Sequence, residues 1–302
     1  MLPADFKAVL SRQHYGIVGG HSAVKPCLWL KKAVRGEGFC YKQKFYGIES
    51  HRCMQMTPAV GWCAHRCLFC WRNTEYTLGQ SMDSWDEPEG IIDGAIGAHR
   101  QAVSGFRGLG VDERLFQEAR KPKHVAISLA GEPTAYPPLG DLISGFKRRG
   151  MTTYLVTNGT LPERLEALKT LPTQLYLSVV APDEETYARV CKPAFPDGWE
   201  RIGRTLDLLP SIGTKKVVRI TAVKGLNMFD PAGYARLIEK AQPDFVEVKA
   251  FMFVGGSRNR LSQDNMPSHG EVVSFAREVG DELSYVLKDE KEDSRVALLG
   301  RA

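Results

Sequence analysis

Apolar runs long enough for a β-strand alternate with stretches of helical periodicity along most of the chain. We expect strands at 54–62, 123–134, 152–160, 174–182, 215–225, 245–255 and 282–288, with helices at 88–105, 138–149, 162–169, 183–190, 199–208, 231–240 and 268–280. The strands are continuously apolar, as in a parallel sheet that helices cover. Repeated strand–helix units in one direction predict an α/β fold of the barrel type, complete or partial.

The first 54 residues do not share this pattern. They are rich in Gly, Lys and aromatic residues and show no clear period, so we expect loops with short helices there. The sequence thus predicts an N-terminal extension at 1–54 and a barrel domain at 55–302.

Six segments follow predicted strands and carry polar or glycine residues: 63–70, 131–134, 157–159, 178–182, 223–227 and 253–260. In parallel α/β folds the functional site lies at the carboxyl ends of the strands. We therefore expect these segments to converge and to form the site.

Composition narrows the class of protein. The 302 residues are 43% apolar and 25% charged, which is typical of a globular domain, and no apolar run approaches the ~20 residues of a membrane span. The N-terminus carries Asp5 and no continuous apolar segment, unlike a secretory signal. These features predict a cytoplasmic protein without membrane association, whose cysteines are metal ligands or catalysts rather than disulfides.

Positive charge is concentrated in the first 80 residues, which hold eleven Lys and Arg against four Asp and Glu. Such a region suits a polyanionic partner such as nucleic acid, although a solvated basic face has the same composition. The segment 255–260 adds two arginines as phosphate ligands. Five aromatic side chains either stack on bases or pack within the protein: Trp29, Tyr41, Phe45, Tyr46 and Trp71.

Three cysteines lie within eight residues in the segment GWCAHRCLFCW, at Cys63, Cys67 and Cys70. A structural zinc site would need a fourth ligand, for which the loop offers His65, and no second C-x2-C pair follows. An iron–sulfur cluster on three cysteines instead leaves one iron open to a substrate or cofactor. The C-x3-C-x2-C spacing after a strand resembles that of the radical S-adenosylmethionine (SAM) enzymes.

That resemblance implies a partial (β/α)6-type barrel of the radical SAM class and a [4Fe–4S] cluster on the three cysteines. The open iron would chelate SAM, and one electron would cleave it to a 5′-deoxyadenosyl radical that abstracts hydrogen. Phe69, before the third cysteine, and the sequence GEP at 131–133 fit the pattern of this class. The residues expected around SAM are Gly131, Glu132, Thr157, Asn158 and Ser178.

Cys27, Cys40 and Cys53 form a second group, spaced thirteen residues apart. Their surroundings are basic and aromatic rather than core-like, and nearby Lys or Arg favours thiolates. We expect them to hold a second [4Fe–4S] cluster, again with an open iron. The lone Cys191 is interpreted as a small buried apolar residue.

With this second group the sequence resembles the archaeal-type tRNA 4-demethylwyosine synthases over most of its length. The resemblance rests on both cysteine groups, on Lys42, and on the segments 128–134, 157–159, 220–228, 246–261 and 265–269. It implies that pyruvate condenses with N1-methylguanosine at position 37 of tRNA-Phe, beside the anticodon, to give 4-demethylwyosine. The second cluster would hold pyruvate, and Lys42 would activate its ketone as a Schiff base.

The sequence also departs from that family. The stretch SVVAP carries Val180 where the family usually has an aspartate. Eukaryotic relatives contain a flavodoxin-like domain, which 302 residues do not accommodate, so we expect a separate low-potential electron donor. Two other interpretations remain: a radical SAM enzyme that acts on another RNA, a protein or a small molecule, and a zinc protein that binds RNA without catalysis.

Overall fold

The computed structural model describes residues 1–108 and 110–302, and the chain forms two compact units. The first unit comprises Met1–Cys63, Leu78–Val156 and Leu168–Thr173. The second comprises Ala64–Thr77, Thr157–Ala167 and Gln174–Ala302. The loop with the three closely spaced cysteines therefore begins in the first unit and continues in the second.

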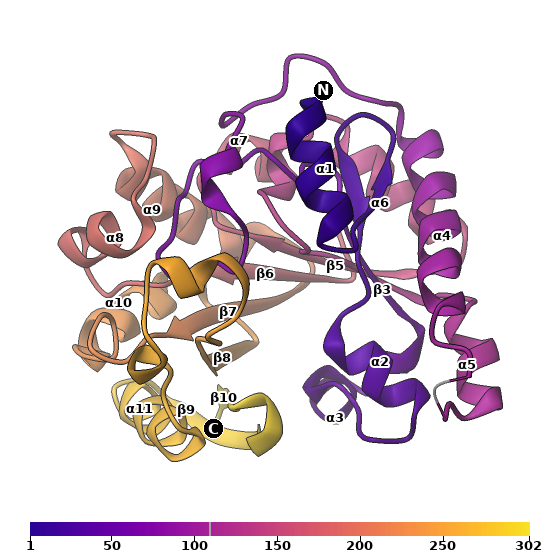
Figure 1. Ribbon diagram of the computed structural model, residues 1–302. Helices are drawn as coiled ribbons and strands as arrows, with labels where there is room; N and C mark the ends of the chain where they lie inside the picture. Colours follow the sequence, from indigo (N-terminus) through magenta and orange to yellow (C-terminus); the bar gives the residue numbers. More distant parts are fainter. Residues whose placement is uncertain (109) are drawn as a thin grey trace. The chain divides into compact units, whose positions relative to one another are not determined.

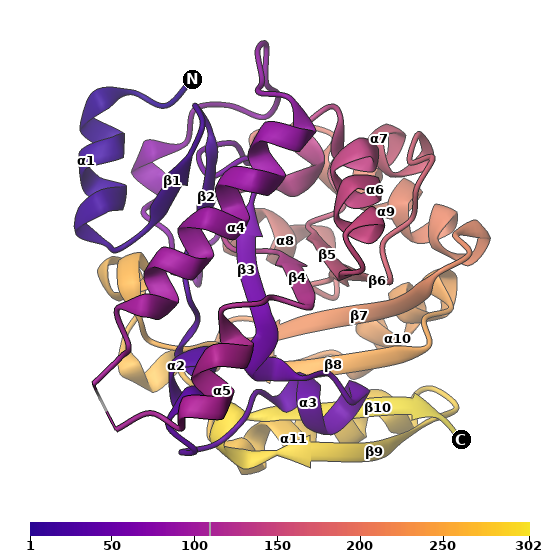
Figure 2. The same cartoon turned by 90° about the vertical axis from the view of Figure 1, so that its right-hand side faces the viewer.

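The first unit is built on five strands in the spatial order β1 (Gly16–Val18), β2 (Ser22–Val24), β3 (Cys53–Thr57), β4 (His124–Ile127) and β5 (Thr152–Thr157). β2 is antiparallel to β1 and β3, whereas β3, β4 and β5 run parallel. The helices are α1 (Ala4–Arg12), α2 (Leu28–Val34), α3 (Tyr41–Tyr46), α4 (Pro88–Ser104), α5 (Glu113–Ala119) and α6 (Leu139–Arg148). Figures 1 and 2 show α4 along β1, β2 and β3, and it also contacts α6.

The short helices α2 and α3 carry most of the second cysteine group. Cys27 and Cys40 immediately precede these helices, and Cys53 is the first residue of β3. A small apolar core holds α2 in place, because its Leu30 and Val34 pack with side chains of α4 and α5. Burial of such side chains stabilises each by about 1.5–3 kcal/mol, so the cysteines rest on a packed scaffold rather than on free loops.

The second unit is built on five strands in the order β6 (Gln174–Ser178), β7 (Lys215–Ala222), β8 (Phe245–Ala250), β10 (Val296–Arg301) and β9 (Tyr285–Lys291). β6, β7 and β8 are parallel, while β10 is antiparallel to both β8 and β9. The helices are α7 (Pro162–Glu166), α8 (Glu184–Cys191), α9 (Gly198–Leu208), α10 (Pro231–Ala241) and α11 (His269–Asp281). In Figure 2, α11 lies behind β9 and β10, and it packs on β8 as well.

The expected helices after residue 88 are all present within a few residues of their predicted bounds. The expected strands are present but shorter, except the one at 282–288, which keeps its length and lies three residues later, as β9. The differences lie in short elements. The segments β1, β2 and α5 have three to seven residues, too few to show a period. β10 was not expected, and it inserts antiparallel beside β8 because its apolar run Val296–Leu299 is buried there. Within residues 1–108 and 110–302, no helix combines the length and apolarity that a membrane crossing requires.

Candidate functional site

The loop after β3 is pinned to the turn that follows β4. The backbone N–H of Glu132 donates to the carbonyl of Trp62 at 2.7 Å, and the N–H of Cys63 donates to that of Gly79 at 2.9 Å. Gly131 has φ +69°, and a Cβ at this position would lie 1.8 Å from the carbonyl oxygen of Ala59. Only glycine fits there, so the GEP turn packs directly against the backbone of the residues that precede Cys63.

Glu132 is 2% exposed, and its Oε1 accepts hydrogen bonds from the backbone N–H and the hydroxyl of Thr134, at 3.1 and 2.7 Å. These bonds fix the carboxylate at the carboxyl end of β4. A buried carboxylate in such a position is suited to an ammonium group of a ligand, because a buried charge needs an opposite charge or hydrogen bonds.

The rest of the cysteine loop is paired with the end of α8. The N–H groups of Arg66 and Leu68 donate to the carbonyls of Cys191 and Val190, both at 2.9 Å. The N–H of Ala194 donates in return to the carbonyl of Ala64 at 2.8 Å. The loop is therefore held like a strand, which explains how eight residues can present cysteines in a fixed geometry.

Among the described residues, the donor atoms of His65 and of the loop's three cysteines do not all lie within 4.8 Å of one another. His65 is 5% exposed, and its Nε2 hydrogen-bonds the hydroxyl of Tyr187 at 2.7 Å. Burial lowers the pKa of His65 to about 4, so the ring is neutral near pH 7. Its ring nitrogen lies within 4.8 Å of the sulfurs of Cys67 and Cys191 instead.

Arg260 holds the loop from a second direction. Its guanidinium donates to the carbonyls of Leu68 and Arg72 at 3.2 and 3.3 Å, and also to the carbonyl of Cys70. The N–H of Gly256 donates to the carbonyl of Trp71 at 2.8 Å. The segment 255–260 thus contacts the cysteine loop. The N–H groups of Arg260 donate to carbonyls of that loop and not to phosphates, which are the partners that the sequence predicts.

Cys67 and Cys70 are half-buried, with arginines close by. A hydrogen bond with Cys191, and then burial, hold the pKa of Cys67 well above its usual value. Burial also raises the pKa of Cys70, while the charge of Arg72 lowers the pKa of both thiols. Such thiols ionise when a metal replaces the proton, which is the behaviour of metal-cluster ligands.

The second cysteine group comes together in the first unit, as expected. Cys27, Cys40 and Cys53 interact electrostatically. Burial, and then the neighbouring cysteines, raise the pKa of Cys27 to about 11 and that of Cys53 to about 12. Among the described residues, the three sulfurs do not all lie within 4.8 Å of one another, whereas a zinc ion ~2.3 Å from each would bring them to about 3.8 Å. The three thiols are therefore neighbours in the first unit without the close approach that a single zinc ion requires.

Lys42 lies inside this group and not on the surface. Its side chain is on α3, the residue is 8% exposed, and its Nζ lies 5.1 Å from the ring centroid of Tyr154 on β5. The charge of Lys42 also lowers the pKa of Cys53. The structure thus places a buried amine near the thiol of Cys53 and the ring of Tyr154.

The remaining residues expected near SAM lie at strand ends in the second unit. Thr157 ends β5, and its hydroxyl accepts from the N–H of Gly159 at 3.1 Å. The Oδ1 of Asn158 accepts from the N–H and hydroxyl of Thr160 at 3.0 and 2.7 Å. Ser178 is half-buried at the end of β6. Gly131 and Glu132 belong to the first unit, so the meeting of all six strand-end segments stays a prediction.

Val180, at the position of the family's aspartate, is buried and takes part in hydrogen bonding through its backbone carbonyl. Its carbonyl accepts from the Nδ2 of Asn227 at 2.8 Å, and the Oδ1 of Asn227 accepts from the N–H of Val223 at 2.7 Å. Asn227 is fully buried and thereby links the segments that follow β6 and β7.

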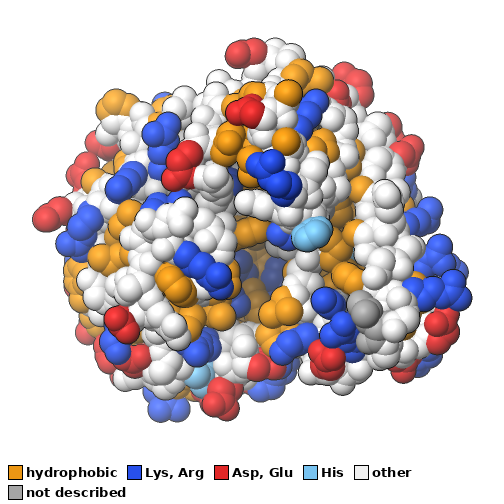
Figure 3. Space-filling model, in the orientation of Figure 1, with side chains coloured by type: hydrophobic (Ala, Val, Ile, Leu, Met, Phe, Trp, Pro, Cys, Tyr) orange, Lys and Arg blue, Asp and Glu red, His pale blue; other side chains and the backbone are white. Residues whose placement is uncertain are grey.

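The basic and aromatic residues of the N-terminal region divide into two kinds. Tyr41 is buried and packs edge-on against Phe45, with centroids 5.5 Å apart, so packing describes it. Lys32 lies 5.1 Å from the ring centroid of Trp29 on the half-exposed side of α2. In Figure 3, the face around α2 and α5 carries both blue Lys and Arg and red Asp and Glu side chains.

Sequence reasoning missed Arg72, Tyr187, Cys191 and Arg260 around the loop, and Tyr154 beside Lys42. Arg72 follows the third cysteine by two residues, so its charge could have been considered from the sequence, whereas the other four act through contacts distant along the chain that no spacing reveals. For Cys191 the expectation of burial is met, since it is fully buried, but its thiol also contacts that of Cys67.

Comparison with known proteins agrees with these features. The family model for the radical SAM superfamily matches residues 57–238, and that for wyosine base formation matches residues 240–301. A radical SAM methyltransferase from Sphaerobacter thermophilus, 14% identical, superposes with a TM-score of 0.56 over 93% of this chain and 80% of its own, which shows the α/β fold of the class.

Closer relatives cover nearly the whole chain. The S-adenosyl-L-methionine-dependent tRNA 4-demethylwyosine synthase of Pyrococcus abyssi is 54% identical over 99% of this chain and 90% of its own length. The enzyme of the same name from Methanocaldococcus jannaschii is 42% identical, covering 99% and 96%. A solved structure of TYW1 with a lysine–pyruvate adduct bound is 41% identical, with a TM-score of 0.90 over 100% of this chain and 97% of that one. The chain is therefore a radical SAM enzyme with the partial-barrel fold of that class, and it belongs to the family of tRNA 4-demethylwyosine synthases.

Proposed function

We propose that this enzyme condenses pyruvate with N1-methylguanosine at position 37 of tRNA-Phe and so forms 4-demethylwyosine. The observation that carries the proposal is the position of Lys42, buried in the first unit close to Cys53 of the second cysteine group. The relative TYW1 has been solved with a lysine–pyruvate adduct. A buried lysine beside metal-ligating thiols is a suitable place for the same adduct.

The radical SAM family implies a [4Fe–4S] cluster and SAM. We assign the cluster to Cys63, Cys67 and Cys70, and SAM to the neighbourhood of Gly131, Glu132, Thr157, Asn158 and Ser178. When bound, the cluster and SAM together supply the radical that removes a hydrogen atom from the methyl group of the target base. The protein contributes the fixed loop, the buried carboxylate of Glu132 and the positive charges of Arg72 and Arg260.

We assign a second [4Fe–4S] cluster to Cys27, Cys40 and Cys53, carried by an N-terminal extension at 1–54. Pyruvate is small and offers little apolar area, so chelation of its carboxylate is an effective way to hold and orient it. Lys42 then attacks the ketone carbon as a neutral amine, and water leaves as the Schiff base forms. The imine carbon accepts the radical of the base's methyl group more readily than the free ketone would. The bond to the carboxyl carbon then breaks, and that carbon leaves as the CO2 radical anion, which carries off the electron that cleaved SAM. The exocyclic amine of the guanine displaces Lys42 from the imine, and the two remaining pyruvate carbons close the ring.

The target base is stacked in tRNA and must turn out of the stack before it can react, which costs a few kcal/mol. Lys31 and Lys32 on α2 support this step by binding the backbone phosphates. We expect the electron to come from a separate low-potential protein, and in vitro from dithionite.

Mass spectrometry of nucleosides tests this proposal directly. N1-methylated tRNA-Phe incubated anaerobically with the enzyme, SAM, pyruvate and dithionite should yield 4-demethylwyosine, and pyruvate labelled with 13C should place the label in the new ring. Formation of 5′-deoxyadenosine with no change in the nucleoside would instead favour a radical enzyme that acts on another RNA, a protein or a small molecule.

A further inference from the structure

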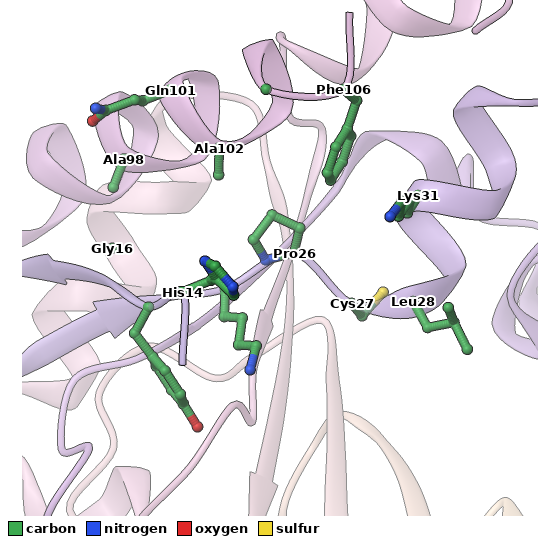
Figure 4. A pocket seen from close by; sticks show the side chains of 13 residues that line it. His14, Gly16, Pro26, Cys27, Leu28, Lys31, Ala98, Gln101, Ala102 and Phe106 are labelled. Carbon is green, nitrogen blue, oxygen red and sulfur yellow. The ribbon is translucent and has the colours of Figure 1, made fainter. Parts of the chain in front are cut away.

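A pocket of about 600 Å3 opens in the first unit beside the second cysteine group. Its walls come from the end of α1 and the start of β1, from the segment 25–31, and from the last turns of α4 with Phe106 after them. In Figure 4, Phe106 points from the α4 side toward Pro26, while Lys31 lies on the α2 side with Cys27 and Leu28. The volume lies in the range of small-ligand sites.

The charge of this pocket is entirely positive. His14, Lys25 and Lys31 line it, and no Asp or Glu is among the lining residues. Lys31 and His14 form no ion pair within residues 1–108 and 110–302. The Nζ of Lys25 lies 4.8 Å from the ring centroid of Tyr15, on the same side of the pocket. The pocket is therefore complementary to an anion.

The opposite wall is apolar and ends in an amide. Phe106 is half-buried and packs on the small core that holds α2, so its ring is fixed in orientation. Leu28 is 64% exposed beside it, and Gln101 is an exposed amide on α4. A fixed aromatic face with an amide and cations nearby matches the three parts of a nucleotide: the base plane, the base edge and the phosphate.

We propose that this pocket binds one nucleotide of the tRNA substrate, adjacent to the one that reacts. This inference rests on the proposed function, because it takes tRNA as the substrate. The base stacks on Phe106 with its edge toward Gln101, and the phosphate lies between Lys31 and His14. Cys27 is part of the wall, so a nucleotide bound here is anchored beside the segment that carries the second cysteine group and Lys42.

The test compares variants by their affinity for N1-methylated tRNA, measured anaerobically with the cluster-loaded enzyme. Lys31→Ala should weaken binding about fivefold or more and flatten the slope of log K against log salt by about 0.7, since one fewer phosphate is neutralised. Phe106→Leu, which keeps apolar packing and removes the flat ring, should weaken binding about tenfold and leave the slope unchanged. Lys147→Ala, an equal loss of charge on the exposed end of α6, is the matched control and should change neither.

Iron content and 5′-deoxyadenosine formation without tRNA should be unchanged in all three variants, which shows that fold and cluster are intact. Unchanged affinity in both Lys31→Ala and Phe106→Leu overturns the inference. The inference is also overturned if the variants form less product than the wild type with a protein electron donor but equal amounts with dithionite. That result would mean that the pocket binds the electron donor. If the wild-type enzyme binds tRNA but makes no 4-demethylwyosine, the proposed function is wrong. The affinities of the variants would still show whether the pocket binds a nucleotide of tRNA.

Discussion

The two cysteine groups reach their positions by different routes. Cys63, Cys67 and Cys70 share one loop, which backbone bonds to the end of α8 and the guanidinium of Arg260 hold in place. Cys27, Cys40 and Cys53 come from three elements, and the packing of α2, α3 and β3 brings them together. A local motif can be recognised from spacing alone, whereas a distributed one depends on the whole scaffold around it.

The neighbours of the two groups differ as well. The loop is accompanied by Arg72 and Arg260, which remain charged and can only bind or polarise. The distributed group is accompanied by Lys42, an amine that can lose its proton and form a covalent bond. We therefore assign radical generation to the loop and pyruvate activation to the distributed group.

The largest expected effect is on the loop. Replacing Cys63, Cys67 or Cys70 with Ala should abolish 5′-deoxyadenosine formation. The loop supplies three cysteine ligands to the cluster, and two would not hold it. Chromatography of the reaction mixture with SAM and dithionite measures this product. Unchanged formation in any one variant would rule out that residue as a ligand.

Replacing Cys27, Cys40 or Cys53 with Ala should separate the two functions. These variants should still form 5′-deoxyadenosine but no 4-demethylwyosine, since the loop is intact and pyruvate is no longer held. Nucleoside mass spectrometry and 5′-deoxyadenosine measured on the same samples test the separation. Normal amounts of 4-demethylwyosine would show that the distributed group has no part in the reaction.

Lys42 distinguishes binding of pyruvate from its activation. Lys42→Ala should keep the iron content of the wild type and lose condensation, and Lys42→Arg, which retains the charge but cannot form the imine, should fail equally. Borohydride treatment with labelled pyruvate should trap a covalent adduct in the wild type alone. Wild-type product from Lys42→Arg would mean that charge is sufficient and that no Schiff base is needed.

Cys191 should change the reduction potential of the cluster on the loop without being one of its ligands. In the protonated pair the Cys67 thiol donates to Cys191, and once a cluster replaces the proton of Cys67 the thiol of Cys191 becomes the donor. Hydrogen bonds to cluster sulfurs favour the reduced, more negative state. Cys191→Ala should therefore lower the reduction potential in an electron paramagnetic resonance titration, while Cys191→Ser, which keeps a donor, should restore it. An identical potential in Cys191→Ala and wild type would show that the contact only fills space.

The smallest effect concerns the scaffold of the distributed group. The Nε2–H of buried His99 on α4 donates to the carbonyl of Ala119 in α5 at 2.9 Å, and burial lowers the pKa of His99. Below pH 6.5 the His99 imidazole of the unfolded chain binds a proton that the buried imidazole of the folded chain does not. The contribution of His99 to the free energy of unfolding is therefore complete above pH 6.5 and decreases, by at most about 1.4 kcal/mol per pH unit, as the pH falls below that value. Urea midpoints between about pH 7.5 and about pH 5 should fall less for His99→Gln than for the wild type. Equal slopes would contradict a buried neutral imidazole.

The pattern of apolar residues predicts the repeating strands and helices after residue 88, because long amphipathic elements reveal their own period. It does not predict β1, β2, α5 or β10, which are short and owe their structure to tertiary pairing. The cysteine positions are apparent in the sequence. Their neighbours Tyr154, Tyr187 and Arg260 are not, because each contacts its site from a distant part of the chain.

The central claim is that the two groups hold two clusters with separate tasks, and iron analysis tests it most directly. The wild type and a variant with Cys27, Cys40 and Cys53 all replaced by Ala should be purified anaerobically and assayed for iron and sulfide per chain. We predict that the variant keeps about half of each, since one of two equal clusters is lost. Equal iron and sulfide in the two proteins would contradict the second cluster and with it the division of tasks.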